Sequence, residues 1–106
     1  MKRVSFDINR IMDTEIKRLA ELSHESYPQM IQKLLEGGLI AKDFAIINTK
    51  MTAAPFGIDR YCVFSEESER LFVYFKNIFN VSEGSLARNL LAYSLAKRQE
   101  ERSTGS

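Results

Sequence analysis

The chain has 106 residues, 44% of them apolar, which is enough for one small domain with a single core. Its net charge of +1 excludes the strongly basic composition that is common in nucleic-acid-binding proteins. Cys62 is the only cysteine, which excludes an internal disulfide or a thiolate metal cluster and fits a reducing cytoplasm. No apolar run is long enough to span a bilayer, and the chain starts with a polar strand rather than a signal peptide, so we expect a cytoplasmic protein with no membrane partner.

Residues 3–8 alternate between polar and apolar side chains, which predicts a half-buried strand. Its inward residues are Val4, Phe6 and Ile8, and its outward residues are Arg3, Ser5 and Asp7. Asn9 predicts the start of a helix, which should end at the polar residues 23–25. Apolar residues at helical spacing make its buried face: Met12, Ile16, Leu19 and Ala20.

Ser26 predicts the start of a second helix, with Pro28 in its first turn, where the missing amide hydrogen costs nothing. Its buried face is Met30, Ile31, Leu34 and Leu35. Gly37 and Gly38 predict its end, although the match of Leu39 with Leu95 allows a longer helix. Residues 39–58 then form a connector with a weak signal: 44–47 fit a short strand or a helical turn, and 52–57 resemble a loop.

The second half repeats this order. Residues 60–64 predict a strand, Ser65 the start of a third helix, residues 80–81 its end, and Ser82 the start of a fourth. The apolar faces of the two helices are Leu71, Phe72, Phe75, Ile78 and Phe79, and then Leu86, Ala87, Leu90, Leu91 and Leu95. The aromatic run 71–75 is wider than one face needs, so Val73 or Tyr74 is available to cover the connector or to meet a partner.

One offset of 56 residues superimposes both helix starts and most apolar positions of the two halves. The sequence therefore predicts two units, 1–38 and 59–99, joined by the connector 39–58 and followed by a flexible tail, 100–106, with both units in one structural domain. A lone strand with two helices cannot close a core, whereas two copies can. Arg60 falls where the first strand has the inward Val4, which predicts that the second strand is short, bulged or shifted there.

A short strand followed by two helices with a capped junction resembles the ribbon-helix-helix family of DNA-binding proteins. The resemblance covers residues 2–38 well and 59–97 moderately, and it depends on patterns rather than on a signature. It implies a mainly α fold in which two antiparallel strands form a ribbon and four helices support it. Here both units belong to one chain, so the resemblance implies a monomeric pseudo-dimer that can associate further on DNA.

In that family the ribbon enters the major groove of double-stranded DNA, and the start of the second helix of each unit contacts phosphate. The matching base-reading positions are Arg3, Ser5, Asp7, Tyr61 and Val63. The matching phosphate positions are Lys2, Ser26, Tyr27, Ser82 and Gly84. Arg3 suits a guanine edge, Asp7 a cytosine amino group and Val63 a thymine methyl group.

The resemblance thus implies a sequence-specific DNA-binding protein, either a transcriptional regulator or an accessory factor in the processing of plasmid or phage DNA. Tandem members occur among the accessory proteins of conjugation, which implies a protein partner such as a relaxase. A second interpretation stays open, in which the near-neutral charge and the carboxylates of Asp7, Asp59 and Glu83 mark a protein-interaction module with little DNA binding.

Catalysis is the poorest hypothesis. His24, the only histidine, lies at a helix junction without an evident nucleophile, and Cys62 is better explained as a small core residue. No glycine-rich phosphate loop or metal-ligand spacing occurs, so we expect no catalytic residue, no metal and no cofactor.

Overall fold

The computed structural model describes residues 3–41 and 57–104. This part of the chain is mainly helical, with four helices and one two-stranded antiparallel sheet. The order is β1 (Arg3–Ile8), α1 (Arg10–Leu22), α2 (Tyr27–Ala41), β2 (Ile58–Val63), α4 (Glu66–Phe79) and α5 (Glu83–Thr104). The predicted helices and strands are thus confirmed in kind and order. The interpretations of segments 44–47 and 52–56, and the position of Lys2, lie outside the described residues.

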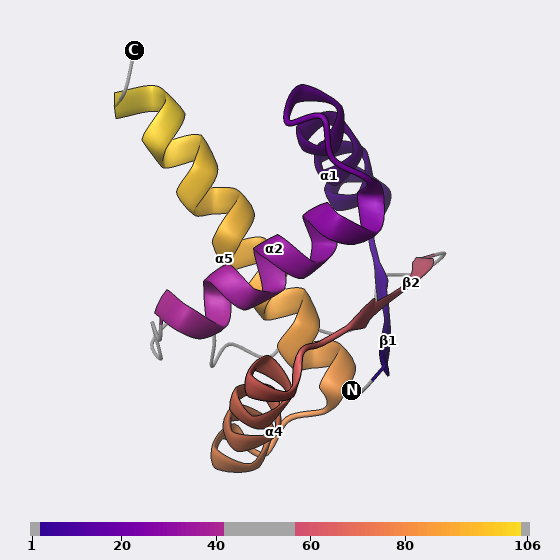
Figure 1. Cartoon of the computed structure of the whole chain (residues 1–106), viewed down its shortest axis with the longest axis vertical. Helices are drawn as coiled ribbons and strands as arrows, with labels where there is room; N and C mark the ends of the chain where they lie inside the picture. Colours follow the sequence, from indigo (N-terminus) through magenta and orange to yellow (C-terminus); the bar gives the residue numbers. More distant parts are fainter. Residues whose placement is uncertain (1–2, 42–56, 105–106) are drawn as a thin grey trace.

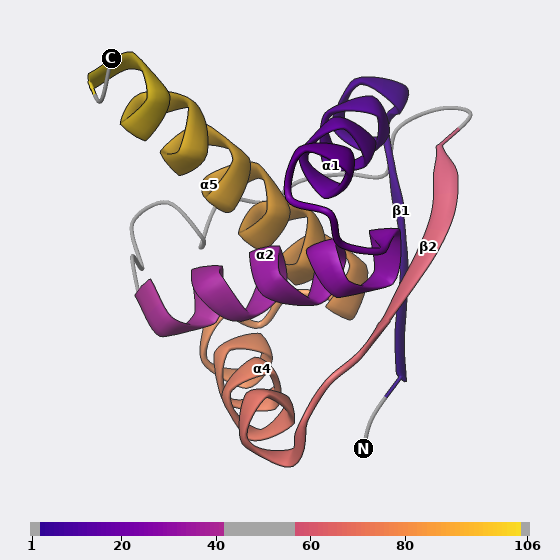
Figure 2. The same ribbon diagram turned by 45° about the horizontal axis from the view of Figure 1, so that its top comes forward.

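The two strands lie along one side of the crossing helices α2 and α5, with α1 at one end of the strands and α4 at the other (Figures 1 and 2). The first strand packs against α5 and the second packs against α2, so each strand contacts a helix from the other half of the chain. The two halves therefore share one core.

The strands pair without a bulge, from Arg3 opposite Val63 to Ile8 opposite Ile58. At the centre, Ser5 lies opposite Tyr61, and these two residues are related by the same offset of 56 that relates the halves. The prediction that β2 is short, bulged or shifted at Arg60 is wrong. Arg60 faces inward at a regular ladder position, because a buried carboxylate from α1, Asp13, pairs with its guanidinium.

All four predicted helix starts are confirmed by side-chain capping. Asn9 Oδ1 accepts the amide of Met12 at 2.8 Å. The hydroxyls of Ser26, Ser65 and Ser82 accept the amide three residues later at 3.3, 3.3 and 3.1 Å. Such caps satisfy amides that have no partner within the helix. The predicted end of the third helix is also confirmed: Asn80 is the C-cap of α4, with a left-handed φ of 51°.

The predicted helix stop at Gly37 and Gly38 is wrong, and the longer helix that the match of Leu39 allowed is confirmed, because α2 continues to Ala41. Gly38 faces α5, where an added Cβ would lie 2.8 Å from Leu90 Cδ2 and 3.3 Å from the Leu90 carbonyl oxygen. The residue 56 positions later, Ser94, donates its hydroxyl to the Leu34 carbonyl at 2.6 Å. These small residues let α2 and α5 cross closely.

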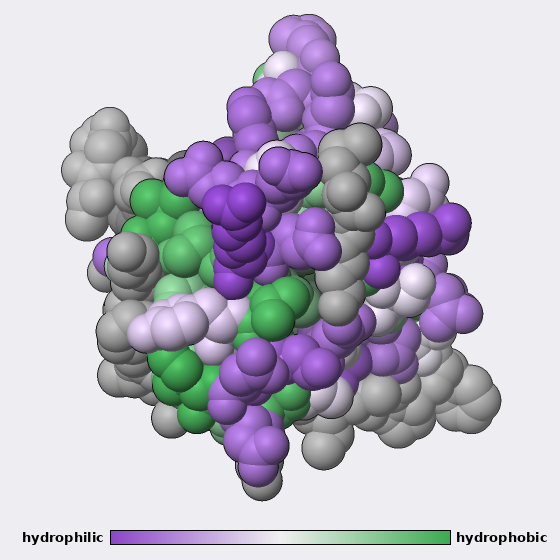
Figure 3. Space-filling model, turned by 60° about the horizontal axis from the view of Figure 1, so that its bottom comes forward, coloured by the Kyte–Doolittle hydropathy of each residue, from purple (hydrophilic) through white to green (hydrophobic). Residues whose placement is uncertain are grey.

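The core takes residues from every element. Val4, Phe6, Ile8, Cys62 and Phe64 are buried, together with the apolar faces of α2 and α5 and the rings of Phe72 and Phe75. On α4, Tyr74 of the aromatic run 71–75 remains 58% exposed, so only part of the run belongs to the core. Ile78 is 53% exposed, so its predicted place on the buried apolar face of this helix is wrong. Figure 3, which views the molecule from the end where α4 lies, shows apolar side chains on this surface.

Two further findings concern the helices. Helix α5 extends to Thr104, so the tail predicted from residue 100 is helical over most of its length. No helix in the described part of the chain is long and apolar enough to cross a membrane.

Candidate nucleic-acid interface

The outward side of the two strands is a face of six side chains, which we call the ribbon face. It consists of three cross-strand pairs: Arg3 with Val63, Ser5 with Tyr61, and Asp7 with Asp59. All are exposed except Asp7, which is half-buried. The five residues expected to read bases therefore lie together on one side of the sheet, with none of them in the core. Antiparallel pairing places them together because alternate residues of both strands point to the same side.

Charge is unevenly distributed along the ribbon face. At one end the guanidinium of Arg3 lies 4.0 Å from the centroid of the Tyr61 ring, a cation–π contact. The neighbouring Val63 is 39% exposed and Tyr61 is 48% exposed. At the other end two carboxylates, Asp7 and Asp59, are directly opposed. The ribbon face thus has a cationic and apolar end and an acidic end.

The carboxylate of Asp7 is held by α5. Arg88 Nη1 lies 2.7 Å from Asp7 Oδ1 and also donates to the Asp7 carbonyl at 3.4 Å. The Arg88 side chain is only 10% exposed and the Asp7 side chain is 26% exposed, so the guanidinium is largely shielded from water and the carboxylate is partly accessible. Arg88 is a functional candidate that the sequence interpretation missed, because 81 residues separate it from Asp7.

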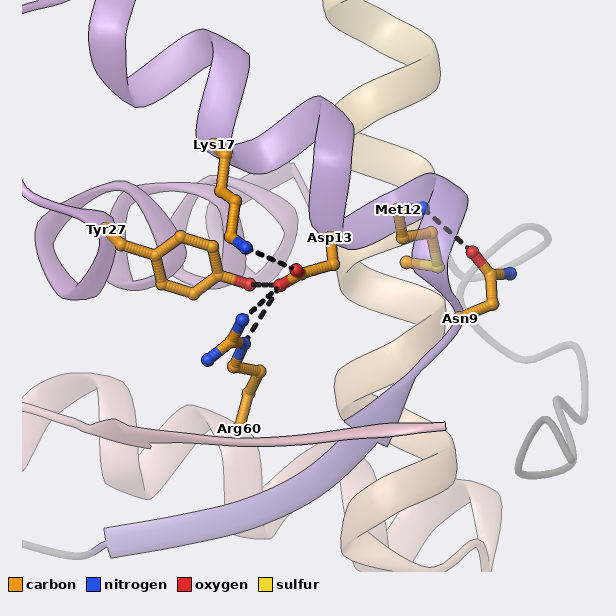
Figure 4. Close-up of polar contacts among 6 residues, drawn as sticks. All are labelled: Asn9, Met12, Asp13, Lys17, Tyr27 and Arg60. Atoms are coloured by element: carbon orange, nitrogen blue, oxygen red, sulfur yellow. Dashed lines mark hydrogen bonds and ion pairs between the residues drawn. The ribbon is translucent and has the colours of Figure 1, made fainter. Parts of the chain in front are cut away.

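A second ion-pair network lies behind the strands (Figure 4). The carboxylate of Asp13, on α1, accepts Arg60 Nε and Nη2, each at 2.9 Å. The hydroxyl of Tyr27 donates to the same carboxylate, Lys17 Nζ lies 3.2 Å from it, and the Arg60 guanidinium lies over the Tyr27 ring at 4.5 Å. Both carboxylate oxygens of Asp13 are thereby matched by donors.

This network sets the ionisation of its members. Burial alone would raise the pKa of Asp13, but hydrogen bonds from Arg60, Tyr27 and Lys17 outweigh it and lower that pKa to about 2. Burial and the hydrogen bond to Asp13 raise the pKa of Tyr27. Arg60 also has a raised pKa, because its side chain donates to Asp13. The network is therefore charged as Asp⁻ and Arg⁺ at neutral pH.

The expected phosphate positions lie at the starts of α2 and α5. Ser26 and Ser82 are exposed there, and both hydroxyls are used as caps. The hydroxyl of Tyr27 is directed to Asp13, which leaves only its backbone amide for a phosphate. At Gly84 an added Cβ would lie 3.1 Å from Arg88 Nη1, so the Arg88 guanidinium lies beside the start of α5 and adds positive charge there.

Two shallow depressions flank Tyr61, one of about 610 Å³ over the ribbon face and one of about 450 Å³ beside the start of α2. The second is lined by Lys17, Tyr27, Pro28, Asp59, Arg60 and Tyr61. The surface around the ribbon is therefore contoured rather than flat, and it combines cationic and aromatic side chains.

The two residues considered as catalytic candidates, His24 and Cys62, lie apart from the ribbon face. His24 is exposed at the turn after α1, with a left-handed φ of 55°. Cys62 is buried, which raises the pKa of its thiol to about 12, with Glu36 adding to the effect. Among the described residues no cluster of three or more histidine, cysteine or acidic side chains is arranged to hold a metal ion.

Comparison with protein-family models, with curated proteins and with solved structures returned no match. A function for the chain is therefore inferred from its own fold and surface.

Proposed function

We propose that this chain is a tandem ribbon-helix-helix protein, a pseudo-dimer within one chain, that binds double-stranded DNA by placing the ribbon face in the major groove. The strand register supports the pseudo-dimer, since the central pair Ser5–Tyr61 joins equivalent residues of the two halves. Helix packing supports it as well. Gly38 lies against Leu90, and Ser94 contacts Leu34. The offset of 56 relates Gly38 to Ser94 and Leu34 to Leu90, so the two contacts are equivalent in the two halves.

The single observation that carries DNA binding is the ribbon face itself. A two-stranded antiparallel ribbon fits the major groove of B-form DNA, where side chains on its outer side reach base edges. Six side chains here project outward from a pair of strands whose inner side is anchored on helices. That anchoring keeps the outer side chains in a fixed register, which is what base recognition requires.

Each end of the ribbon face suits a different base edge. Arg3 has the donors for guanine O6 and N7, and the exposed methyl groups of Val63 suit the methyl group of thymine. Asp59 is an exposed acceptor for a cytosine amino group, whereas Asp7 is paired with Arg88. Because the two ends differ, the preferred DNA site is asymmetric rather than palindromic.

Phosphate contacts would come from the backbone amides at the starts of α2 and α5, which flank the strands and carry the positive end of the helix dipole. Arg88 supports this at α5, since its charge lies beside Gly84 and offsets that of Asp7. With a net charge of only +1, the protein suits a role as a regulator or as an accessory factor that gains affinity from a protein partner such as a relaxase.

Binding to a short random-sequence duplex at increasing salt tests DNA binding. Affinity should fall steeply as salt rises, because each phosphate contact releases condensed counterions. Arg3→Ala should weaken binding, and Arg70→Ala is the matched control, since Arg70 is an exposed arginine on α4 with the same charge. No measurable binding at low salt, or equal losses in the two variants, would refute the assignment of the ribbon face.

A second candidate function is supported by the acidic end of the ribbon face. Asp7 and Asp59 are directly opposed where a polyanion would have to approach, which favours a protein-interaction module on the same fold. Asp59→Asn separates the two functions. If the ribbon binds DNA, this variant should bind random-sequence duplex more tightly than the parent protein. If the ribbon binds a protein, neither the parent protein nor the variant should bind the duplex.

A further inference from the structure

An arginine and a tyrosine from the two halves of the chain are in contact on the outer side of the ribbon. Arg3 lies on β1 and Tyr61 on β2, and the two are diagonal neighbours, because Arg3 is directly opposite Val63, two residues after Tyr61. Diagonal neighbours on one side of an antiparallel pair are within reach of long and aromatic side chains. The guanidinium carbon of Arg3 lies over the Tyr61 ring, 4.0 Å from its centroid, which is a close cation–π contact.

This contact leaves the hydrogen-bond donors of Arg3 available. A cation–π contact uses no hydrogen-bond acceptor, so the N–H groups of the guanidinium can still donate to a base edge. The two arginines paired with carboxylates near the strands differ in this respect, since Arg60 donates to Asp13 and Arg88 donates to Asp7. In residues 3–41 and 57–104 no carboxylate pairs with Arg3. The Arg3 side chain is therefore held in place without using the groups that recognise a base.

The contact occurs at one end of the ribbon only. The offset of 56 makes Asp59 the equivalent of Arg3, and Ser5 the equivalent of Tyr61. These two positions have neither a cation nor an aromatic ring, so the other end of the ribbon lacks a contact of this kind. Because each half of the chain supplies one of its members, the contact forms only where the two strands pair.

From this geometry we infer that Tyr61 is a positioning residue: it orients Arg3 toward a single guanine and does not read a base itself. The ring restricts the long Arg3 side chain, so less conformational entropy is lost when the guanidinium binds guanine O6 and N7. In the major groove the contact loses water, which makes a cation–π contact stronger than it is on an exposed surface. The inference rests on the proposed function, and it places the guanine at the end of the ribbon that carries Arg3 and Val63.

Nuclear magnetic resonance of the free protein tests the positioning of Arg3 without DNA. Protons over the face of an aromatic ring resonate at higher field, so the Arg3 side-chain protons should move to lower field in Tyr61→Leu. They should stay near their parent positions in Tyr61→Phe, which keeps the ring. Tyr74→Leu is the matched control, since Tyr74 is an exposed tyrosine on α4. Identical Arg3 resonances in the parent protein and in Tyr61→Leu would overturn the inference.

Selection from a random pool of DNA duplexes tests the role of Tyr61 in recognition. The base pair at which Arg3→Ala loses the preference of the parent protein identifies the guanine. Tyr61→Leu should lose the preference at that same base pair, and it should bind the selected site about fivefold to thirtyfold more weakly than the parent protein. Tyr61→Phe should keep both the preference and most of the affinity, because phenylalanine offers the same ring face. Tyr74→Leu should bind like the parent protein.

The outcomes separate this inference from the proposed function. If the parent protein retains no DNA, the proposed function fails and the inference fails with it. If the parent protein selects a motif and Tyr61→Leu changes a different base pair from Arg3→Ala, Tyr61 reads a base itself and the inference alone is overturned. In an Arg3→Ala background Tyr61→Leu should cause no further loss of affinity, and equal losses in both backgrounds would show that the two residues act independently and overturn the inference.

Discussion

Replacing Asp13 by asparagine should destabilise the protein at neutral pH but not in acid. Its carboxylate has a pKa of about 2 in the folded chain, against an ordinary value of 3.8, and this difference corresponds to about 2 kcal/mol in favour of the folded state. Because the folded pKa is the lower one, this stabilisation is complete above about pH 4 and is lost as the pH falls to about 2. Asparagine imitates the protonated form, so the variant lacks the contribution at every pH.

Urea unfolding followed by circular dichroism at pH 7 and pH 2 gives the measurement. The free energy of unfolding of Asp13→Asn should be lower than that of the parent protein by about 2 kcal/mol at pH 7 and nearly equal to it at pH 2. Comparing the variant with the parent protein at the same pH cancels the contribution of the other carboxylates, which titrate in both proteins. Asp59→Asn is the control, and a change within about 0.5 kcal/mol is expected because Asp59 is exposed. A difference for Asp13→Asn that is the same at both pH values would refute the account of the network.

Adjacent glycines of α2 should respond in opposite directions to alanine: Gly37→Ala, where the new Cβ would have its nearest contact at 3.9 Å, should stabilise by up to about 1 kcal/mol. Gly38→Ala should destabilise the protein by about 1–3 kcal/mol, because Leu90 occupies the place of the new Cβ. Urea unfolding measures both variants, and equal effects on the free energy of unfolding would contradict the close crossing of α2 and α5. Cys62 should react with a thiol reagent at pH 8 only after unfolding, because its thiol is buried and has a pKa of about 12. Rapid labelling of the folded protein would contradict this and show that β2 opens. On a DNA site selected by the protein, Arg3→Ala should weaken binding by about 1–3 kcal/mol and relax the preference at one base pair, whereas an unchanged affinity would remove Arg3 from the base-reading residues.

The parts of the fold that depend on neighbouring residues could be predicted from the sequence. Asn9, Ser26, Ser65 and Ser82 cap helices by bonding to amides three residues away, so each is recognisable in a short window. The alternation in residues 3–8 likewise predicts which side of β1 is buried. The same alternation places Arg3 and Ser5 on the outer side of the ribbon.

The features that sequence reasoning missed depend on contacts between distant residues. Gly38 reads locally as a helix stop, and only the neighbouring Leu90 explains why a glycine lies inside α2. Arg60 interrupts the apolar pattern of its strand, because the carboxylate that neutralises it belongs to Asp13, 47 residues earlier. The pairing of Asp7 with Arg88 spans 81 residues and leaves Asp59 as the exposed carboxylate of the ribbon face.

Selection from a random pool of short DNA duplexes at moderate salt tests the central claim most directly. If the ribbon face reads the major groove, sequencing of the retained duplexes should give an enriched motif, and the motif should be asymmetric because the two ends of the ribbon carry different side chains. Retention of no duplex at low salt, or retention without any enriched motif, would contradict sequence-specific recognition by this ribbon.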